Sequence, residues 1–245
     1  MEKKEIIGRN PVLEYLRTLE PGQDAELFIS ESAHGKIIEI IAAEARRAAV
    51  KITYAQREFF SRVDSSSRHQ GVMLRIVSRG PQIRDDEFIA ELAARSGVLV
   101  ALDQLTDPHN IGSIIRTAEA LGAGGVIMTK AHAPEINQTI IKTSAGATAH
   151  IRIMHVGNIA QTLEKAREAG FWIIGTSDEG DTGMEKLREL RPAVLVIGSE
   201  GSGMRRLTGE KCDYLVRIPL RGHISSLNAS VAAGILLWEL LREDD

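Results

Sequence analysis

The chain has 245 residues, of which 43% are hydrophobic and 26% charged, with a formal net charge of −3. This length suits one large or two small domains with a real core, and no apolar run approaches the roughly 18–20 residues of a membrane span. The single cysteine, Cys212, excludes an internal disulfide and a cysteine-cluster metal site, so with no signal-peptide core behind the first residues we expect a cytoplasmic protein without metal.

The first part of the chain predicts a small α/β domain over residues 1–77. Asn10 is a good helix cap and Pro11 fits the first helical position, which predicts a helix through Arg17. Apolar residues at helical spacing predict a second helix over residues 35–50. The remaining predicted elements are strands at 25–29, 51–54 and 71–77 and a helix at 56–63.

A polar segment with Gly80-Pro81 predicts a linker over residues 78–84, and a second α/β domain follows over residues 85–245. Its apolar strand runs lie at 98–102, 125–128, 151–155, 171–176, 193–197 and 215–218. Near-continuous apolar strands that alternate with helices predict a mainly parallel sheet covered on both faces.

The charges are unevenly distributed between these two parts. Residues 1–80 carry 13 basic and 11 acidic side chains, whereas residues 81–245 carry 17 and 22. A slightly basic first part beside a mildly acidic second part permits RNA binding through a local patch, without demonstrating it.

Polar side chains follow three of the predicted strands, and ligands of doubly wound sheets bind at such strand ends. In the first loop Asn110 is a candidate cap for a helix that begins at Ile111. Arg116 lies six residues later in an otherwise small and apolar helix. From its spacing alone, this arginine is either a solvated residue or a clamp for an anion.

The second loop has three glycines within residues 198–203 but matches neither the dinucleotide fingerprint nor a P-loop. Its Glu200 would repel a phosphate, so it suits an amine-bearing ligand, a hydrogen bond to an arginine, or simple exposure on a turn. The third loop runs from Ile218 into the last helix and contains Ser226 and Asn228. Both readings of Asn228, as a helix cap and as a ligand contact, stay open.

Residues 110–118, 197–203 and 218–232 resemble, in this order, the three motifs of the SpoU (TrmH-type) RNA 2′-O-ribose methyltransferases of the SPOUT class. The similarity covers most of residues 97–242. Residues 7–14 and 69–72 resemble the L30e-like substrate-binding domain found in the 23S rRNA guanosine-2′-O-methyltransferase (RlmB) group. One departure is that Ala149 and Arg152 stand where the family often has an acidic residue and then a proline.

The resemblance implies an L30e-like α/β amino-terminal domain and a carboxy-terminal α/β SPOUT domain with a deep trefoil knot. It also implies S-adenosyl-L-methionine as cofactor, RNA as substrate and a homodimer. Carried over by position, the cofactor-binding residues are Gly175, Thr176, Gly198, Glu200, Ile218, Leu220, Ser226 and Leu227.

The implied catalytic residues are Arg116, Asn110, Glu200, Ser226 and Asn228. Because free arginine has a pKa above about 12 and is a poor base, the expected role of Arg116 is to clamp a phosphate and stabilise the developing alkoxide. Glu200 is expected to orient Arg116 or the substrate, with Asn110 and Asn228 as organisers.

The substrate that the resemblance implies is a guanosine ribose of 23S rRNA. A tRNA 2′-O-methyltransferase and an inactive RNA-binding or ribosome-associated protein are the alternatives. In the first domain Arg9, Arg68 and Arg75 are candidate phosphate contacts, although each taken alone is more typical of an ordinary solvated arginine.

Overall fold

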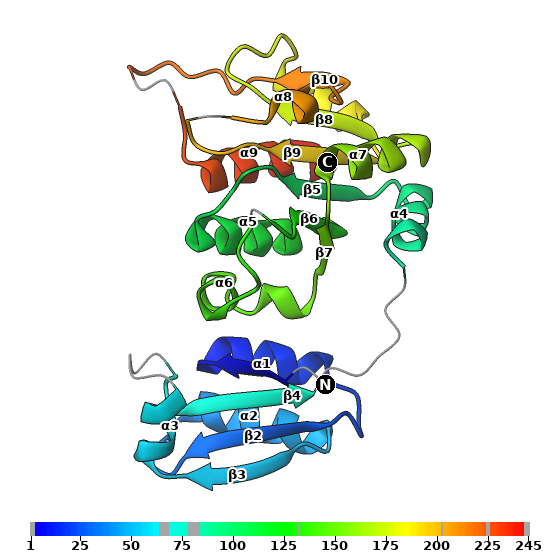
Figure 1. Ribbon diagram of the computed structural model, residues 1–245. Coiled ribbons are helices and arrows are strands. Elements are labelled where there is room, and N and C mark those ends of the chain that lie inside the picture. The colour runs from blue at the N-terminus through cyan, green and yellow to red at the C-terminus, as the bar shows by residue number, and fades with distance from the viewer. Residues whose placement is uncertain are drawn as a thin grey trace. The chain divides into compact units, whose positions relative to one another are not determined.

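We describe the protein from a computed structural model, which describes residues 3–63, 69–77, 84–131, 133–201, 203–223 and 226–242 (Figure 1). The described chain groups into two compact units. The first comprises the chain up to residue 82 together with residues 141–150, and the second comprises residues 83–140 and 151–245. The predicted domains at 1–77 and 85–245 did not anticipate the segment 141–150. The predicted linker residues 78–83 lie outside the described residues.

The first unit is built on a sheet whose described strands follow the order β1-β4-β2-β3. Strand β4 pairs antiparallel with β1 and β2, and β3 pairs parallel with β2. The elements are β1 (Lys3–Ile7), α1 (Arg9–Thr18), β2 (Ala25–Ser30), α2 (Lys36–Arg47), β3 (Lys51–Ala55), α3 (Arg57–Val63) and β4 (Val72–Val77). The sequence patterns predicted all of these elements except β1.

The helices of this unit follow the apolar patterns that predicted them. Helix α2 buries Ile38, Ile41 and Ala45 along one stripe, as helical spacing requires. Helix α1 begins two residues earlier than predicted, because Gly8 and not Asn10 occupies the N-cap position. Gly8 has φ 95°, which a residue with a Cβ rarely adopts, so the glycine sets this turn.

The second unit contains a sheet of six described strands, all parallel, in the order β10-β8-β9-β5-β6-β7. This result confirms the predicted parallel sheet. The strands are β5 (Val98–Leu102), β6 (Gly125–Thr129), β7 (Arg152–Val156), β8 (Trp172–Thr176), β9 (Ala193–Ile197) and β10 (Tyr214–Val216). The described helices are α4 (Asp85–Ala94), α5 (Pro108–Ala120), α6 (Gln138–Thr143), η1 (Ala147–Ala149, in the first unit), α7 (Ile159–Glu168), η2 (Met184–Glu189), α8 (Arg206–Gly209) and α9 (Ala229–Leu241).

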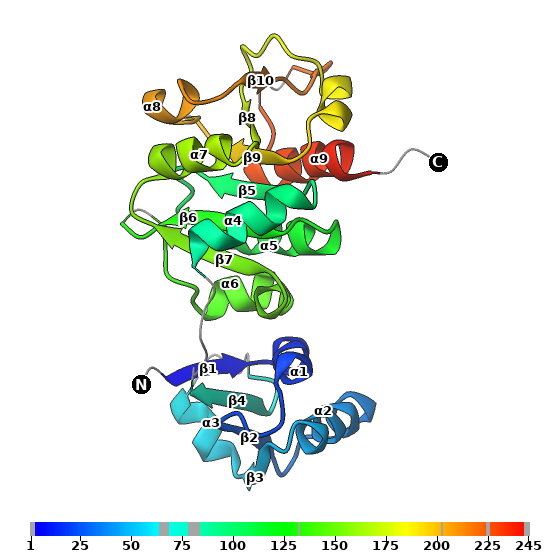
Figure 2. The same ribbon diagram turned by 90° about the vertical axis from the view of Figure 1, so that its right-hand side faces the viewer.

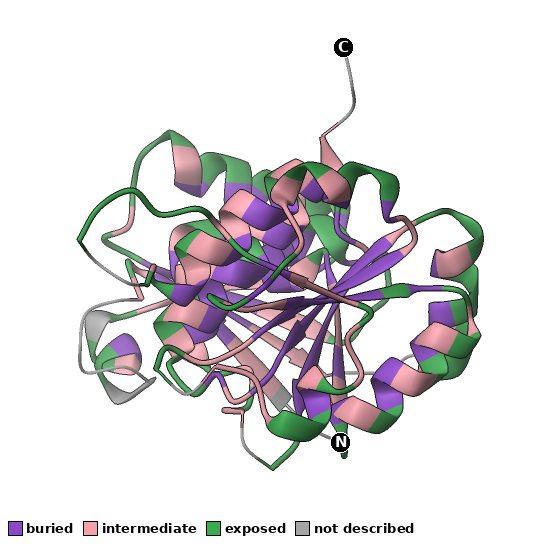
Figure 3. Cartoon of the chain, turned by 90° about the horizontal axis from the view of Figure 1, so that it is seen from above, coloured by how far each residue is buried: buried purple, intermediate pink, exposed green. Residues whose placement is uncertain are grey.

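Helices cover both faces of this sheet (Figure 1 and Figure 2). Ile89 of α4 and Leu163 of α7 pack with Leu99 and other inward side chains on one face. Helices α5 and α9 pack together on the other face. Strands β5, β6 and β9 are buried along their whole length, as the purple strands of Figure 3 illustrate. Each fully buried Leu, Ile or Val contributes about 1.5–3 kcal/mol of transfer free energy, so burial explains the unbroken apolar runs.

The register of the parallel strands brings the ends of four of them to one edge. Leu102 of β5 pairs with Ile197 of β9, and Val216 of β10 pairs with Thr176 of β8. The loops that leave these strands therefore begin side by side. None of the described helices is long and apolar enough to cross a membrane.

Candidate functional site

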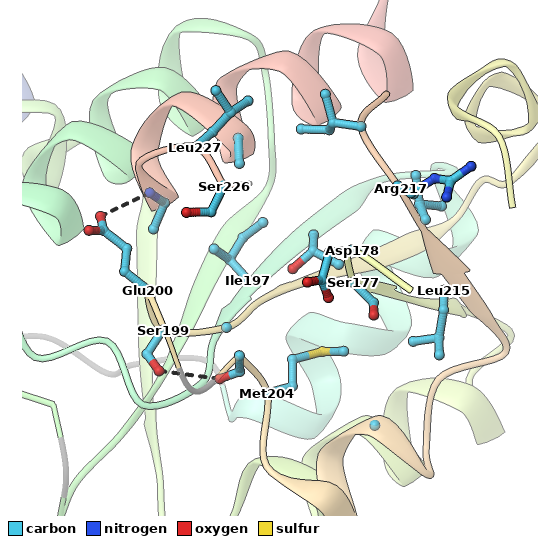
Figure 4. Close-up of a pocket in the computed structure, with 18 of the residues that line it drawn as sticks. Ser177, Asp178, Ile197, Ser199, Glu200, Met204, Leu215, Arg217, Ser226 and Leu227 are labelled. Carbon is cyan, nitrogen blue, oxygen red and sulfur yellow. Dashed lines mark hydrogen bonds between the residues drawn. The ribbon is translucent and has the colours of Figure 1, made fainter. Parts of the chain in front are cut away.

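A cavity of about 550 Å³ lies where the loops after β8, β9 and β10 meet the start of α9 (Figure 4). Glu200, Ser226 and Leu227 lie toward one end of it, and Ser177, Asp178 and Arg217 toward the other. Its size is within the range of about 300–1,000 Å³ that is usual for small-molecule ligands. Its position at the carboxyl ends of parallel strands is where doubly wound sheets bind ligands.

Seven of the eight residues predicted to bind the cofactor line this cavity. They are Thr176, Gly198, Glu200, Ile218, Leu220, Ser226 and Leu227. The eighth, Gly175, lies behind the wall within β8, where an added Cβ would be 2.6 Å from Cε of Met204 and 2.9 Å from Cδ2 of Leu215. Since Met204 and Leu215 line the cavity, Gly175 makes room for its wall.

Glu200 is the centre of a hydrogen-bonded cluster at the cavity. Its Oε1 accepts from Nδ2 of Asn110 at 2.9 Å, from Nδ2 of Asn228 at 2.7 Å and from the backbone N–H of Ala229 at 3.0 Å. Nδ2 of Asn228 also donates to Oδ1 of Asn110 at 2.9 Å. The cluster thus joins one residue from each of the three loops, at positions 110, 200 and 228.

Asn228 is both a helix cap and a member of the polar cluster at the cavity, the two roles that the sequence left open. Its Oδ1 accepts from the backbone N–H groups of Ser230 at 3.0 Å and Val231 at 3.3 Å, which makes it the N-cap of α9. Its Nδ2 is directed to the cluster. The cap therefore fixes the orientation of the amide that reaches Glu200.

Asn110 is not a helix cap, contrary to the prediction. Helix α5 begins at Pro108, and Asp107 is its N-cap, with Oδ1 accepting from the backbone N–H of His109 at 2.9 Å. Aspartate before proline is a strong helix start because the proline fits the first helical position. Asn110 consequently lies inside the first turn, and its side chain is free to bind Glu200.

Arg116 is exposed on α5 and does not line the cavity. Within the described ranges its guanidinium has no hydrogen-bond or ion-pair partner. The expected contact between Glu200 and Arg116 is not present, since Glu200 accepts hydrogen bonds from Asn110, Asn228 and Ala229 instead. An exposed and unpaired guanidinium remains available to an anionic ligand. Ser226 lines the cavity but lies outside this cluster.

Asp103 is a buried carboxylate beside the cavity that the sequence reasoning missed. It follows β5 directly and is fully buried, with its Oδ2 accepting from the backbone N–H of Arg205 at 2.8 Å. Its own N–H donates to the carbonyl of Ile197 at 2.9 Å. It thereby fixes the loop after β9 from both ends. A carboxylate immediately after a wholly apolar strand was the signal that could have identified it.

The sequence reasoning missed other lining residues that lie near the predicted ones in the chain. Ser177 and Asp178 follow Thr176, Arg217 precedes Ile218, and Met204 and Arg205 lie in the loop that contains Glu200. Behind the wall, burial raises the pKa of the Cys212 thiol to about 12, with the charge of Asp213 adding to the effect. Cys212 does not line the cavity and remains an ordinary protonated thiol. Across the part of the chain that the structure describes, no three His, Cys, Asp or Glu side chains group closely enough to hold a metal ion.

Comparisons with known proteins agree with this arrangement. The profile of the SpoU rRNA Methylase family matches residues 97–238. A second profile, described as RNA 2′-O ribose methyltransferase substrate binding, matches residues 6–81. The two matches correspond to the two parts of the chain that its sequence patterns separate.

Similarity over most of the chain extends to bacterial proteins, one of them only provisionally named. The chain is 40% identical over 227 residues to the 23S rRNA (guanosine-2′-O-)-methyltransferase RlmB of Pseudomonas aeruginosa, covering 91% of this chain and 90% of that protein. It is 37% identical over 243 residues to YacO of Bacillus subtilis, which is provisionally named a TrmH family tRNA/rRNA methyltransferase, covering 97% and 95%. The crystal structure of an AdoMet-bound rRNA methyltransferase from Sinorhizobium meliloti matches the fold with a TM-score of 0.76 at 24% identity, covering 97% of this chain and 86% of that one.

Proposed function

Because the chain belongs to the SpoU rRNA Methylase family, we propose that it transfers a methyl group from S-adenosyl-L-methionine to a ribose 2′-hydroxyl, at a guanosine of 23S rRNA. The observation that carries this proposal is the cluster at the cavity. Three loops that are far apart in the sequence meet there through Asn110, Glu200 and Asn228. Such convergence of polar side chains at a cavity is a feature of ligand sites rather than of simple turns.

The residues that line the cavity have the chemistry that the proposed cofactor needs. An added Cβ at Gly198 would lie 2.4 Å from the carbonyl carbon of Gly203 and 2.6 Å from the nitrogen of Met204, so the loop closes on itself only with glycine there. Ile197, Met204 and Leu227 supply apolar surface for a purine, and the backbone groups of the loops supply donors and acceptors. When bound, the cofactor supplies an electrophilic methyl group.

The chain's own residues have separable roles in this proposal. The cluster around Glu200 holds the loops after β9 and β10 in one arrangement, so that the ribose is met by a preformed site. Arg116 contributes a positive charge toward a phosphate and the oxygen that becomes negative as its proton leaves. Asp103 is a positioning residue, because its hydrogen bond to Arg205 holds the loop that lines the cavity.

The choice of 23S rRNA as substrate rests on similarity to known proteins and not on the geometry of the site. The match of the substrate-binding profile to residues 6–81 and the 40% identity to RlmB both favour rRNA. The similarity to YacO is compatible with either tRNA or rRNA. The presence of Asn110, Glu200 and Asn228 in one hydrogen-bonded cluster speaks against an inactive RNA-binding protein.

Two further features implied by the family belong to the same proposal, namely a trefoil knot and a homodimer. The knot is proposed from the family alone, and the chain passes from β9 to β10 at the sheet edge and then returns as α9, which packs on α5. Helix α9 is apolar almost throughout, yet it exposes Val231 (50%) and Trp238 (57%), two turns apart on one face. That exposed face supports a second copy as its partner. Light scattering tests it: Trp238→Glu is expected to shift a dimer toward monomer, and a wild-type protein that is monomeric contradicts it.

The experiment that tests the function is transfer of a labelled methyl group to total RNA, followed by mapping of the modified nucleotide. We expect a single 2′-O-methylguanosine in 23S rRNA. A label in tRNA would show that the substrate is tRNA and not 23S rRNA, and would leave the proposed methyl transfer unchanged. A failure to label any RNA, with cofactor binding verified by calorimetry, would contradict the proposed reaction.

A further inference from the structure

The first unit has a cavity of its own, of about 430 Å³, lined by Arg9, Ser30, Ser32, Ala33, His69, Gln70 and Gly71. These residues come from three segments, which follow β1, follow β2 and precede β4. Because β1 and β2 both run antiparallel to β4, they end at the same edge of the sheet. The cavity therefore lies at the edge of the sheet where β1 and β2 end and β4 begins.

Arg9 joins two of these segments and keeps part of its guanidinium unused. Its backbone N–H donates to Oε1 of Gln70 at 3.0 Å, and its Nε donates to the carbonyl of Gln70 at 3.2 Å. Within the described residues its two Nη atoms have no partner. Arg9 is also the first residue of α1, whose first turn contains no acidic side chain and whose Gly8 cap makes no side-chain hydrogen bond. The helix dipole therefore adds to a positive potential at the cavity.

Among the described residues, the rest of the lining consists of uncharged groups, most of which can donate hydrogen bonds, and includes no carboxylate. Nδ1 of His69 accepts from the backbone N–H of Gly71 at 2.9 Å, so the proton of the neutral ring is on Nε2. The His69 ring stacks on Phe60 at 5.0 Å, which fixes its plane. Oγ of Ser30 and Oγ of Ser32 lie 3.0 Å apart and hydrogen-bond to each other.

The neighbouring arginine candidates are less available than Arg9. Arg75 donates to Oε1 of Glu5 from Nη2 at 2.9 Å and from Nε at 3.1 Å, and its guanidinium lies over the ring of Phe28. Arg68 lies outside the described residues. Of the described pair, Arg9 is the one whose charge has no protein counterion.

We propose that this cavity binds one unpaired nucleotide of the RNA substrate, with a phosphate against the Nη atoms of Arg9 and the base beside His69. A guanidinium suits a phosphate because its donors match two phosphate oxygens. The neutral donors suit the acceptor atoms of a base edge, which are accessible only when the base is unpaired and unstacked. This inference rests on the proposed function, because it names the part of the RNA that the first unit reads.

Binding of fluorescein-labelled RNA to the full-length protein, followed by anisotropy, tests the proposal. The probes are an unstructured single-stranded hexamer and a duplex of the same composition. Arg9→Gln is expected to weaken binding of the single strand about tenfold and to reduce the slope of log K against log salt by about 0.7, the contribution of one phosphate contact. Ser32→Asp places a negative charge at the cavity and is expected to weaken binding more than tenfold.

The matched control is Arg46→Gln, which removes the same charge from an exposed arginine in the last turn of α2, away from the cavity. We expect it to change affinity less than twofold. Equal losses from Arg9→Gln and Arg46→Gln would mean general electrostatics and would overturn the proposal. So would unchanged binding by Ser32→Asp.

Two further measurements separate this inference from the proposed function. Cofactor binding by calorimetry is expected to be nearly normal in both variants, because neither residue lines the cofactor cavity. If the wild-type protein methylates RNA while Arg9→Gln and Ser32→Asp bind RNA normally, only the nucleotide cavity is wrong. If the wild-type protein transfers no methyl group, the proposed function itself fails, whatever the anisotropy gives.

Discussion

The charged groups at the two cavities differ in how many of their hydrogen bonds are made to other groups of the protein. In the second unit the carboxylate of Glu200 accepts from three protein donors and is committed to holding loops together. In the first unit Arg9 uses its backbone N–H and Nε internally, while its Nη atoms stay free. The difference suggests that the second unit is preformed for chemistry and the first is prepared to gain contacts with substrate. Changes in the second unit should therefore alter rate or cofactor affinity, and changes in the first should alter RNA affinity.

The largest expected effect is that of Arg116→Ala. Loss of the unpaired guanidinium should lower methyl transfer at saturating substrates by at least about 10³-fold, because charge on the reacting oxygen is then left without a fixed counter-charge. Cofactor affinity should stay within about twofold, since Arg116 does not line the cavity. The control is Arg95→Ala, at another exposed arginine of the same unit. Normal turnover by Arg116→Ala would contradict its assignment.

Glu200→Ala should come next, with a loss of methyl transfer of about 10²-fold. It removes the shared acceptor of Asn110, Asn228 and the N–H of Ala229, so the three loops lose their common contact. Glu200→Gln retains an acceptor oxygen and should lose only about tenfold. Single-turnover rates measure both. Equal rates for the two variants would mean that the hydrogen bonds around position 200 do not matter for the reaction.

A smaller effect, on cofactor affinity and stability, distinguishes two glycines of the second unit. Gly198→Ala would place a Cβ 2.4 Å from backbone carbon of Gly203, which cannot move without opening the loop. Gly175→Ala meets only side-chain atoms, such as Sγ of Cys212 at 2.7 Å, and these can shift. We expect Gly198→Ala to weaken cofactor binding about tenfold or more and to destabilise the fold by about 1–3 kcal/mol. Calorimetry measures the cofactor affinity and thermal unfolding the stability. A larger loss of either from Gly175→Ala than from Gly198→Ala would contradict the prediction.

The smallest effect is expected at Cys212, behind the cavity wall. Its thiol has a pKa raised by burial to about 12 from 9.0, so at pH 8 it should react slowly with iodoacetamide until the protein is unfolded. Because the folded state holds the proton more tightly, this group's contribution to stability is present below pH 9 and is lost as the pH rises toward 12. Cys212→Ser should leave methyl transfer unchanged. Fast labelling of the native protein would contradict the burial of the thiol.

The fold was largely predictable because its elements bury whole apolar segments. Strand β9, for example, is a run of five buried residues between a proline and a glycine, and no other element fits that pattern. Strand β1 was missed because Lys3, Lys4 and Glu5 give the sequence no alternation of apolar and polar residues. The strand is recognised only from its pairing with β4. The membership of residues 141–150 in the first unit was equally invisible, since it depends on contacts with α1 such as that between Tyr15 and Thr148.

The site shows the same division. Sequence motifs identified the loops at Asn110, Glu200 and Asn228, because polar residues and glycines at the ends of buried strands have few structural reasons to be there. They did not reveal that Asp107 caps α5, that Glu200 binds the asparagines rather than Arg116, or that Asp103 holds the loop after β9.

The sequence by itself determined most of the elements, the parallel sheet and the family, because these depend on local patterns and on motifs that are contiguous in the chain. The tertiary structure decided which polar groups are satisfied by the protein and which remain for a ligand. That distinction requires the distances between residues such as Asn110 and Glu200, which are 90 positions apart in the sequence and 2.9 Å apart across a hydrogen bond. Only folding brings such atoms together, and a hydrogen bond exists only within that short range.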